Sequence, residues 1–284
     1  MRATGWVSAH LFYQGDLDRL LVELIAPLAA ELVSAGLADR YFFLRYWDGG
    51  PHVRLRLAAP AAAREQVRAR VASGAASFFR ERPSRDVVDD AGYLADAARL
   101  ARAERMRRYA RRPYPNNSLA FIPYRPEYER YGRAAAMRAV ERHFVESSAI
   151  AMSLLRSGVS ANQRDTTALC LLLLAWLRAG LEPARLVPRP SDLDAVPDVE
   201  QRYLRQRETL GKLAGRMRAV AEDADGGGAF AAWRDSVDRL RADLGGSPAT
   251  RRIVDTCAHL VCNRLGVDSA GEAYLRYLAA RSAG

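Results

Sequence analysis

The segment 41–58, YFFLRYWDGGPHVRLRLA, constrains the fold of this chain more than any other stretch. Two runs rich in aromatic and branched residues flank Asp48-Gly49-Gly50-Pro51, and glycines between two such runs are typical of a tight turn. We therefore predict a β-hairpin. Because successive side chains of a strand point to opposite faces, one face of this hairpin can be apolar and can cover a hydrophobic core.

The other face of the hairpin is predicted to be cationic. In the second strand His52, Arg54 and Arg56 occupy alternate positions, so their side chains share a face. With the arginine of the first strand included, the residues expected on this face are Arg45, His52, Arg54 and Arg56. Guanidinium groups bind carboxylates and phosphates through paired hydrogen bonds, so this cluster indicates an anion site. A solvated strand face is the alternative interpretation.

The elements on either side of the hairpin predict an α+β fold. A strand at 6–13 and a helix at 16–35 precede the hairpin, and Pro27 is able to kink this helix. A helix at 60–82 and a final strand at 118–123 follow it. The resulting order, βαββαβ, is that of a ferredoxin-like antiparallel sheet covered by helices.

The remainder of the chain is predicted to be mainly helical. The expected helices span 134–157, 161–179, 198–221, 229–244, 248–265 and 269–281. Ser269 and Glu272 match a capping box, in which both side chains bind backbone amides at the start of a helix. We therefore expect an α+β region at 1–133 and a helical region at 134–284, packed together as one globular unit.

A basic insertion at 84–117 interrupts the α+β region. It contains the sequence LADAARLARAERMRRYARR, residues 94–112, for which we predict a helix. Its basic residues include Arg102, Arg105, Arg107, Arg108, Arg111 and Arg112. A solvated helix face and a contact surface for an acidic peptide are both open interpretations. Nucleic acid is less favoured, because the run lacks the interleaved aromatic residues of a stacking platform.

The composition limits the possible function classes. The net charge of +10 favours an acidic partner, such as an acidic peptide or an anionic group on a substrate. The chain has no helix-turn-helix, zinc-finger or RNP-type signature, so direct nucleic-acid binding is not expected. Its 3 cysteines lack metal-ligand spacing, and no stretch reaches the ~20 apolar residues of a membrane span. Because the start also lacks a signal-peptide pattern, we expect a cytoplasmic protein with no membrane contact and with neither metal nor cofactor.

One histidine is placed for acid–base chemistry. On a helix, His259 and Asn263 share a face, and Asp255 lies one turn earlier. Polar neighbours of this kind can orient an imidazole, whose ordinary pKa lies near neutrality. A hydrogen-bonded structural histidine is the alternative interpretation. His10 and His143, without obvious partners, are interpreted as structural.

A second polar stretch follows the last predicted strand. Residues 124–132, YRPEYERYG, combine aromatic and ionisable side chains at a strand-to-helix junction, where functional residues are often found. The candidate site residues here are Tyr124, Glu127 and Arg130. Local ion pairs among Glu127, Glu129 and Arg130 are the alternative interpretation.

Three segments together resemble a known family. They are FFLRYWDGGPHVRLRL, PYRPEYERYG followed by ERHFVESSAIAMSLL, and HLVCNRLG, in this order along residues 41–266. They are similar to the C-terminal glutamate-elimination domain of lantibiotic dehydratases, and in particular to its stand-alone relatives from thiopeptide biosynthesis. The resemblance implies that a larger, separate enzyme glutamylates Ser and Thr residues of a ribosomally made precursor peptide. This protein would then remove glutamate to leave dehydroalanine or dehydrobutyrine.

The resemblance also implies roles for individual residues. The family's FIRY arginine corresponds to Arg45, its HxRxR arginines to Arg54 and Arg56, its RYGG arginine to Arg130 and its catalytic histidine to His259. The implied catalytic residues are Arg54, Arg56, Arg130 and His259. Together with the candidates from the sequence pattern, the residues expected to bind substrate are Arg45, His52, Tyr124, Glu127 and Asn263. The second glycine of RYGG is Arg133 here, a departure that points to a remodelled pocket.

Two alternatives to elimination remain open. Thiopeptide pyridine synthases resemble the same family and perform a formal (4+2) aza-cycloaddition of two dehydroalanines, with loss of water and the leader peptide. Such an enzyme has no glutamate to bind, so retention of the arginine cluster and the histidine favours elimination. A non-catalytic leader-peptide binding protein is the second alternative, and it would leave both sets of residues without a role.

Overall fold

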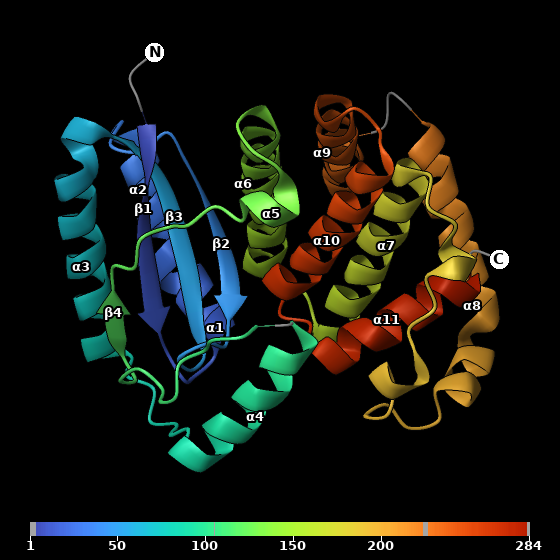
Figure 1. Ribbon diagram of the computed structural model, residues 1–284, viewed down its shortest axis with the longest axis horizontal. Coiled ribbons are helices and arrows are strands. Elements are labelled where there is room, and N and C mark those ends of the chain that lie inside the picture. Colours follow the sequence, from blue (N-terminus) through green and yellow to red (C-terminus); the bar gives the residue numbers. More distant parts are fainter. Residues whose placement is uncertain (1–3, 105, 224–226, 283–284) are drawn as a thin grey trace. The chain divides into compact units, whose positions relative to one another are not determined.

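The computed structural model describes residues 4–104, 106–223 and 227–282, and the chain forms two compact units that divide between Arg125 and Pro126. The first unit combines a sheet with helices, and the second is helical (Figure 1). The expected class, α+β with a mainly helical C-terminal half, is therefore confirmed.

An antiparallel sheet of four strands forms the centre of the first unit, in the order β2-β3-β1-β4. The strands are β1 (Thr4–Phe12), β2 (Arg40–Tyr46), β3 (His52–Pro60) and β4 (Ser118–Ala120). β1 pairs with β3 and β4, and β3 also pairs with β2. This is the predicted ferredoxin-like arrangement.

The predicted hairpin is confirmed, and its turn depends on glycine. Residues 47–51 join the two strands, with Tyr46 opposite His52 in the ladder. Gly49 and Gly50 have φ angles of 89° and 96°, a region that residues with a Cβ atom seldom adopt. The turn therefore needs glycine at both positions.

Helices cover one face of the sheet. α3 (Arg64–Glu81), which follows the single turn η2 (Ala61–Ala63), packs against β1, β3 and β4 and contacts α2 (Ala26–Ser34) (Figure 1). The apolar side chains on this face are Val7, Ala9, Leu11, Phe43, Val53, Leu55 and Leu57, each 0 or 1% exposed. Full burial of a leucine contributes about 1.5–3 kcal/mol, so this face stabilises the first unit.

A wide helical turn precedes Pro27. α1 (Leu17–Arg19) continues into the π-helical η1 (Leu20–Ile25) and then into α2, and the Ala26 N–H donates to the Leu21 carbonyl, five residues back. Proline lacks an N–H, and its ring crowds the carbonyl four residues earlier, so a wider turn accommodates it. The predicted first helix is therefore present, with a π-helical segment just before the proline.

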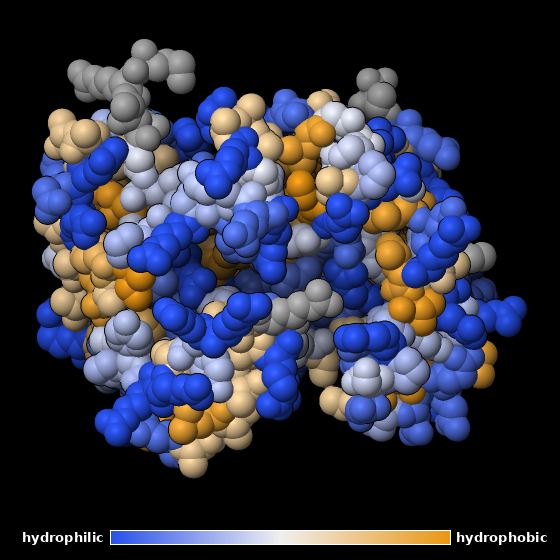
Figure 2. Space-filling view, in the orientation of Figure 1, coloured by the Kyte–Doolittle hydropathy of each residue, from blue (hydrophilic) through white to orange (hydrophobic). Residues whose placement is uncertain are grey.

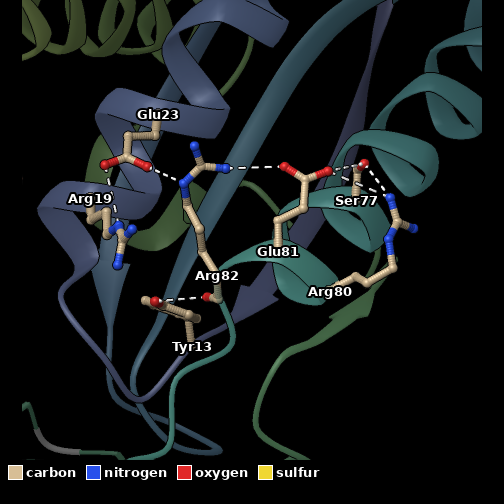
Figure 3. Close-up of polar contacts among 7 residues, drawn as sticks. All are labelled: Tyr13, Arg19, Glu23, Ser77, Arg80, Glu81 and Arg82. Atoms are coloured by element: carbon tan, nitrogen blue, oxygen red, sulfur yellow. Dashed lines mark hydrogen bonds and ion pairs between the residues drawn. The ribbon is translucent and has the colours of Figure 1, made fainter.

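Ion pairs join η1 to the end of α3 (Figure 3). Glu23 contacts Arg19 at 3.2 Å and Arg82 at 2.6 Å, and Arg82 also pairs with Glu81 at 3.2 Å. The Tyr13 hydroxyl donates to the Arg82 carbonyl at 3.1 Å. Because the charged groups are exposed, each pair contributes only about 0–1 kcal/mol. Together they hold the end of α3 beside η1.

The helix of the basic insertion is shorter than predicted. α4 spans Asp90–Ala103, whereas the sequence predicts a helix at 94–112. The Glu104 carboxylate accepts hydrogen bonds from the Tyr46 hydroxyl at 2.8 Å and from Trp47 Nε1 at 2.6 Å. These contacts with the hairpin compete with continuation of the helix, and closely spaced arginines on one helix would repel each other.

Most of the predicted arginine cluster therefore lies outside the helix. Arg107, Arg108, Arg111 and Arg112 follow α4 in irregular structure, Arg102 lies within α4, and Arg105 lies outside the described residues. The Asp48 carboxylate accepts the Ala110 N–H at 2.7 Å, which attaches this segment to the hairpin turn. Figure 2 shows hydrophilic residues spread over the visible face of the protein, between smaller hydrophobic areas.

The second unit consists of helices that bury an apolar core. They are α5 (Tyr128–Tyr131), α6 (Ala135–Arg156), α7 (Ala161–Ala179), η3 (Pro183–Arg185), η4 (Pro190–Asp192), α8 (Val199–Glu222), α9 (Gly228–Leu244), α10 (Pro248–Leu265) and α11 (Ser269–Ser282). The six long helices predicted for this half are confirmed, each bound within one residue. α7 contacts α8, α9, α10 and α11 and is the central helix of the unit. Within the described ranges, no helix combines the length and the apolar character needed to cross a membrane.

Candidate active site

The strand register separates Arg45 from the other cationic residues of the hairpin. Residues directly opposite each other in an antiparallel pair share a face of the sheet. Arg45 lies opposite Val53, on the helix-covered face, whereas His52 lies opposite Tyr46 on the other face. The expectation that all four cationic residues share one face is therefore wrong for Arg45. Its side chain is 13% exposed and forms an ion pair with Asp18 of α1.

The opposite face of the sheet carries the remaining cluster, and a neighbouring strand adds to it. His52, Arg54 and Arg56 lie together on β3 as predicted. In the adjacent β1, Ser8 lies opposite Arg56 and His10 lies opposite Arg54. All of these side chains except that of Arg54 belong to buried residues. The sheet therefore builds a buried polar cluster from two strands.

Two arginine–histidine hydrogen bonds organise this cluster. Arg56 Nη2 lies 3.2 Å from His10 Nε2, and Arg54 Nε lies 3.3 Å from His52 Nε2. A guanidinium group can only donate, so both imidazoles accept through Nε2 and carry their proton on Nδ1. His52 Nδ1 accordingly donates to the Gly50 carbonyl at 2.8 Å. The two rings stack, with centroids 5.0 Å apart and planes 20° apart.

The positive charge of the cluster comes from its arginines, because its histidines are neutral. Burial, followed by the charge of Arg56, lowers the pKa of His10 to about 2. Burial is also the main cause that lowers the pKa of His52 to about 3. Burial and the nearby Arg54 lower the pKa of Arg56 to about 9, so Arg56 remains charged at neutral pH. The cluster therefore combines cationic guanidinium groups with uncharged acceptors.

Arg56 is a buried cation that has no carboxylate partner among the described residues. The residue is 6% exposed, and within the described part of the chain its Nε atom has no hydrogen-bond partner and its guanidinium forms no ion pair. Its other contacts are the Leu55 carbonyl at 3.3 Å, the His10 ring, and the Tyr124 ring, whose centroid lies 5.5 Å away. A buried charge without a counterion is unfavourable, so this arrangement is suited to an anionic ligand.

An aromatic segment borders the cluster. The chain after β4 passes across this face of the sheet (Figure 1), and the Ser8 hydroxyl donates to the Ile122 carbonyl. Tyr124 then packs edge-on against Trp6 and Phe42, at centroid distances of 6.2 Å and 5.9 Å. Tyr124, a predicted site residue, therefore lies with Arg56 in the structure.

The second unit holds the predicted acid–base residue. The side chain of His259, on α10, is 51% exposed, and its Nδ1 lies 2.5 Å from Glu272 Oε2. Glu272 is 8% exposed and also accepts from Arg276 Nε at 2.7 Å. Burial works against the charge of Glu272, but the hydrogen bond from His259 and the charge of Arg276 outweigh it and lower the pKa of this carboxyl. Nδ1 therefore donates to a carboxylate, and Nε2 is the nitrogen that can take up or release a proton.

The group that orients His259 differs from the one predicted. Asp255 Oδ1 accepts from Trp176 Nε1 and from Arg276 Nη1, both at 2.8 Å. Glu272 takes the orienting role that was expected of Asp255. The sequence pattern places Glu272 in a capping box, but its carboxylate binds side chains. The Asp268 carboxylate instead accepts the Gly271 N–H at 2.7 Å and caps α11.

Arg130, Glu127 and Asn263 are the remaining predicted residues of the second unit. Arg130 and Glu127 form an ion pair at 3.1 Å, with side chains 50% and 59% exposed. This is the local pair expected as an alternative to a site role. Asn263 lies one turn of α10 beyond His259. The structure thus gathers His52, Arg54, Arg56 and Tyr124 in the first unit, and places His259, Asn263, Arg130 and Glu127 in the second.

Two residues that the sequence reasoning did not select also matter. His10 completes the arginine–histidine cluster, and its only signal in the sequence is a polar residue within an alternating strand. Arg264, next to Asn263, is fully buried and donates to Ser148 at 3.0 Å and to Ser147 at 3.2 Å. These bonds attach α10 to α6.

Across the residues placed by the structure, no group of at least three His, Cys, Asp or Glu side chains could hold a metal ion.

Three solved structures resemble this chain along almost its whole length. TbtD, a pyridine synthase from thiomuracin biosynthesis, matches with a TM-score of 0.77 and 22% identity, covering 100% of this chain and 98% of TbtD. TsrL matches with a TM-score of 0.62 and 18% identity, covering 99% and 94%. MibB, a tRNA-dependent lantibiotic dehydratase from Microbispora sp. 107891, matches with a TM-score of 0.60 and 26% identity, covering 99% of this chain and 28% of MibB.

A family comparison extends over nearly the whole sequence. No curated protein matches this chain. The model of the family described as "Lantibiotic biosynthesis dehydratase C-term" matches residues 6–283. The match includes every predicted site residue, from Arg45 to Asn263. The chain therefore belongs to the lantibiotic biosynthesis dehydratase C-terminal family.

Proposed function

We propose that this protein is a lyase that tailors a ribosomally made precursor peptide by removing glutamate from glutamylated Ser and Thr residues. The products would be dehydroalanine and dehydrobutyrine. The observation that carries this proposal is Arg56, a buried arginine that has no carboxylate partner among the described residues and is held among neutral histidines. A glutamyl ester presents a carboxylate before the reaction and releases a second one during it, and both are matched by guanidinium groups.

The reaction assigns a role to each group. A base removes the α-proton of the esterified residue, the electrons form the Cα–Cβ double bond, and the Cβ–O bond breaks to release glutamate as a carboxylate. In the proposed scheme His259 Nε2 is the base, and Glu272 fixes the ring orientation and stabilises the imidazolium. A positioned general base typically contributes about 10²–10⁴-fold to the rate.

Arg54 and Arg56 bind the glutamyl group and the departing carboxylate in this scheme. Preorganised donors aimed at developing charge are worth about 10²–10³-fold each in comparable sites. Arg130, which pairs with an exposed Glu127, is proposed to exchange that partner for a substrate carboxylate. Arg45, which is paired with Asp18 on the core side of the sheet, is proposed to act on the substrate only indirectly, through the position of the hairpin.

The proposed reaction requires a glutamylated substrate. This chain corresponds to 28% of MibB, a tRNA-dependent lantibiotic dehydratase. We therefore propose that a separate domain or enzyme attaches glutamate, and that the two proteins share the precursor peptide as substrate.

Pyridine synthesis is the second candidate, and the similarity to TbtD over almost the full length of both chains favours it. That reaction would use two dehydroalanines and has no glutamate carboxylate to bind. Since Arg56 is buried and has no counterion within the part of the chain that the structure describes, elimination accounts for more of the observed geometry. A leader-peptide binding protein without activity would need neither Arg56 nor the Glu272–His259 pair.

A direct comparison of substrates tests the proposal. Purified protein would be incubated with a glutamylated precursor peptide and, separately, with a dehydrated azole-bearing peptide, and the products followed by mass spectrometry. Elimination predicts loss of glutamate from the first and no change in the second. Release of the leader peptide from the second, with the first inert, would establish pyridine synthesis instead. If both peptides bind but neither changes, the protein is a binding module.

A further inference from the structure

His10 lies where it can control the orientation of the Arg56 guanidinium group. It sits on β1, opposite Arg54 in the register, and is 5% exposed. Its Nε2 atom accepts the Arg56 Nη2 hydrogen bond at 3.2 Å. The ring is held on its other side by stacking on His52, 5.0 Å away. Its position is therefore fixed by its neighbours.

The group that accepts the Arg56 hydrogen bond is unusual for a buried arginine. Buried arginines are ordinarily stabilised by carboxylates, which match the guanidinium fork and neutralise its charge. Here the acceptor is an imidazole with its proton on Nδ1, which directs one N–H of Arg56 without neutralising it. Arg54 and His52 repeat the arrangement at 3.3 Å, with the His52 ring fixed by the Gly50 carbonyl. The cluster thus has two guanidinium groups aligned by two stacked rings.

We infer that His10 is a positioning residue that aligns the Arg56 guanidinium through a neutral hydrogen bond and leaves its full charge for an anionic group of the substrate. This inference rests on the proposed function, because it assumes that Arg56 binds a glutamate carboxylate. The Arg56 Nε atom, which is buried and has no hydrogen-bond partner among the described residues, is the donor left for that anion. The low pKa of His10, about 2, is in keeping with a ring that stays neutral at every working pH.

Glutamine and glutamate at position 10 provide a matched test, because they have nearly the same shape and differ in charge. His10→Gln retains a neutral acceptor near the Nε2 position. His10→Glu places a carboxylate there, which would form an ion pair with Arg56 and neutralise its charge. His10→Leu removes the acceptor altogether. Binding of free L-glutamate to the full chain would be measured by calorimetry, together with kcat and KM for a glutamylated peptide.

The affinities of the three variants for glutamate test whether His10 acts as a neutral acceptor. His10→Gln should bind glutamate within about 3-fold of the wild type, and His10→Leu should bind about 10-fold more weakly, the usual effect of one hydrogen bond. His10→Glu should lose about 100-fold or more, because truncating or satisfying one partner of a buried charge pair has effects of this size. The loss should appear mainly in KM. Equal binding by His10→Glu and His10→Gln would overturn the inference, as would unaltered binding by His10→Leu.

Two further observations keep the inference separate from the proposed function. If the wild type eliminates glutamate and the three variants behave like it, only the role of His10 is wrong. If the wild type neither binds glutamate nor eliminates it, the proposed function itself fails. Nitrogen-15 NMR of the wild-type imidazoles should show a neutral Nδ1–H ring for His10, even where a variant does not fold. A cationic ring, or a ring protonated on Nε2, would refute the assignment.

Discussion

Lowering the pH from 7.5 to about 5 should destabilise this protein through histidines that are buried in their neutral form. His10, His52 and His143 are 5%, 0% and 1% exposed. Burial, as the largest cause, lowers the pKa of His10 to about 2 and those of His52 and His143 to about 3, from an ordinary value of 6.5. Below pH 6.5 the unfolded chain therefore binds protons that the folded chain does not. Stability rises with pH wherever the unfolded state binds more protons, so it must fall on acidification.

The size of this destabilisation depends on how far the pH lies below the histidine pKa of the unfolded chain. Each pH unit in this window is worth about 1.4 kcal/mol per histidine, so at about pH 5 each buried ring costs about 2 kcal/mol. The loss begins near pH 6.5 and continues until the folded-state pKa is reached, at about 3 for His143. Domains of ordinary stability have about 5–15 kcal/mol in total, so the effect is large enough to measure.

His143 offers the clearest single test, because it lies outside the proposed site. Its Nδ1 lies 2.8 Å from the Ser236 hydroxyl, whose own proton is donated to Glu146. Nδ1 must therefore donate, and the ring is a neutral Nδ1–H form. His143→Gln keeps an amide that can hydrogen-bond Ser236 and removes the titrating group. The ring also lies 5.0 Å from that of Trp233, whose fluorescence reports on unfolding of this region.

Urea unfolding of the wild type and of His143→Gln would be followed at pH 7.5, 6 and 5. The variant is expected to be less stable at pH 7.5, because packing around the ring is lost. Between pH 7.5 and 5, the further decrease in its free energy of unfolding should be about 2 kcal/mol smaller than that of the wild type. Between pH 7.5 and 8.5 the two proteins should change in parallel. An identical change for both proteins between pH 7.5 and 5 would show that His143 is not buried in its neutral form.

Three further outcomes are expected from substitutions. Glu272→Gln should leave folding intact and lower kcat by about 10–100-fold with little change in KM, because His259 loses the carboxylate that orients it; a normal kcat would show that Glu272 has no such role. Arg56→Lys should raise KM for the glutamylated peptide by about 10-fold or more, because an ammonium cannot reproduce the guanidinium fork, whereas Arg99→Lys on exposed α4 should match the wild type. Arg264→Ala should reduce the free energy of unfolding by about 3–5 kcal/mol, through a cavity and two hydroxyls left without their donor, and an unchanged melting temperature would contradict this.

Local patterns were sufficient for most of the secondary structure. Alternation and the Gly49-Gly50 turn predicted the hairpin, and apolar spacing predicted the long helices. The basic segment after α4 shows the limit of this reasoning. Its alanine and arginine content favours a helix, but hydrogen bonds from the hairpin to Glu104 and from Ala110 to Asp48 hold it in another conformation. Tertiary contacts outweighed propensities that are worth only tenths of a kcal/mol per residue.

The candidate site was also predicted only in part from local patterns. The sequence alone placed His52, Arg54 and Arg56 on one face, because a strand alternates with a period of two whatever it pairs with. It misplaced Arg45, since the face of one strand relative to another depends on register, and a one-residue difference reverses every side chain. His10 and Glu272 could be recognised only in the folded chain. Each acts on a partner from another element, Arg56 in one case and His259 in the other, and sequence spacing carries no information about which elements pack together.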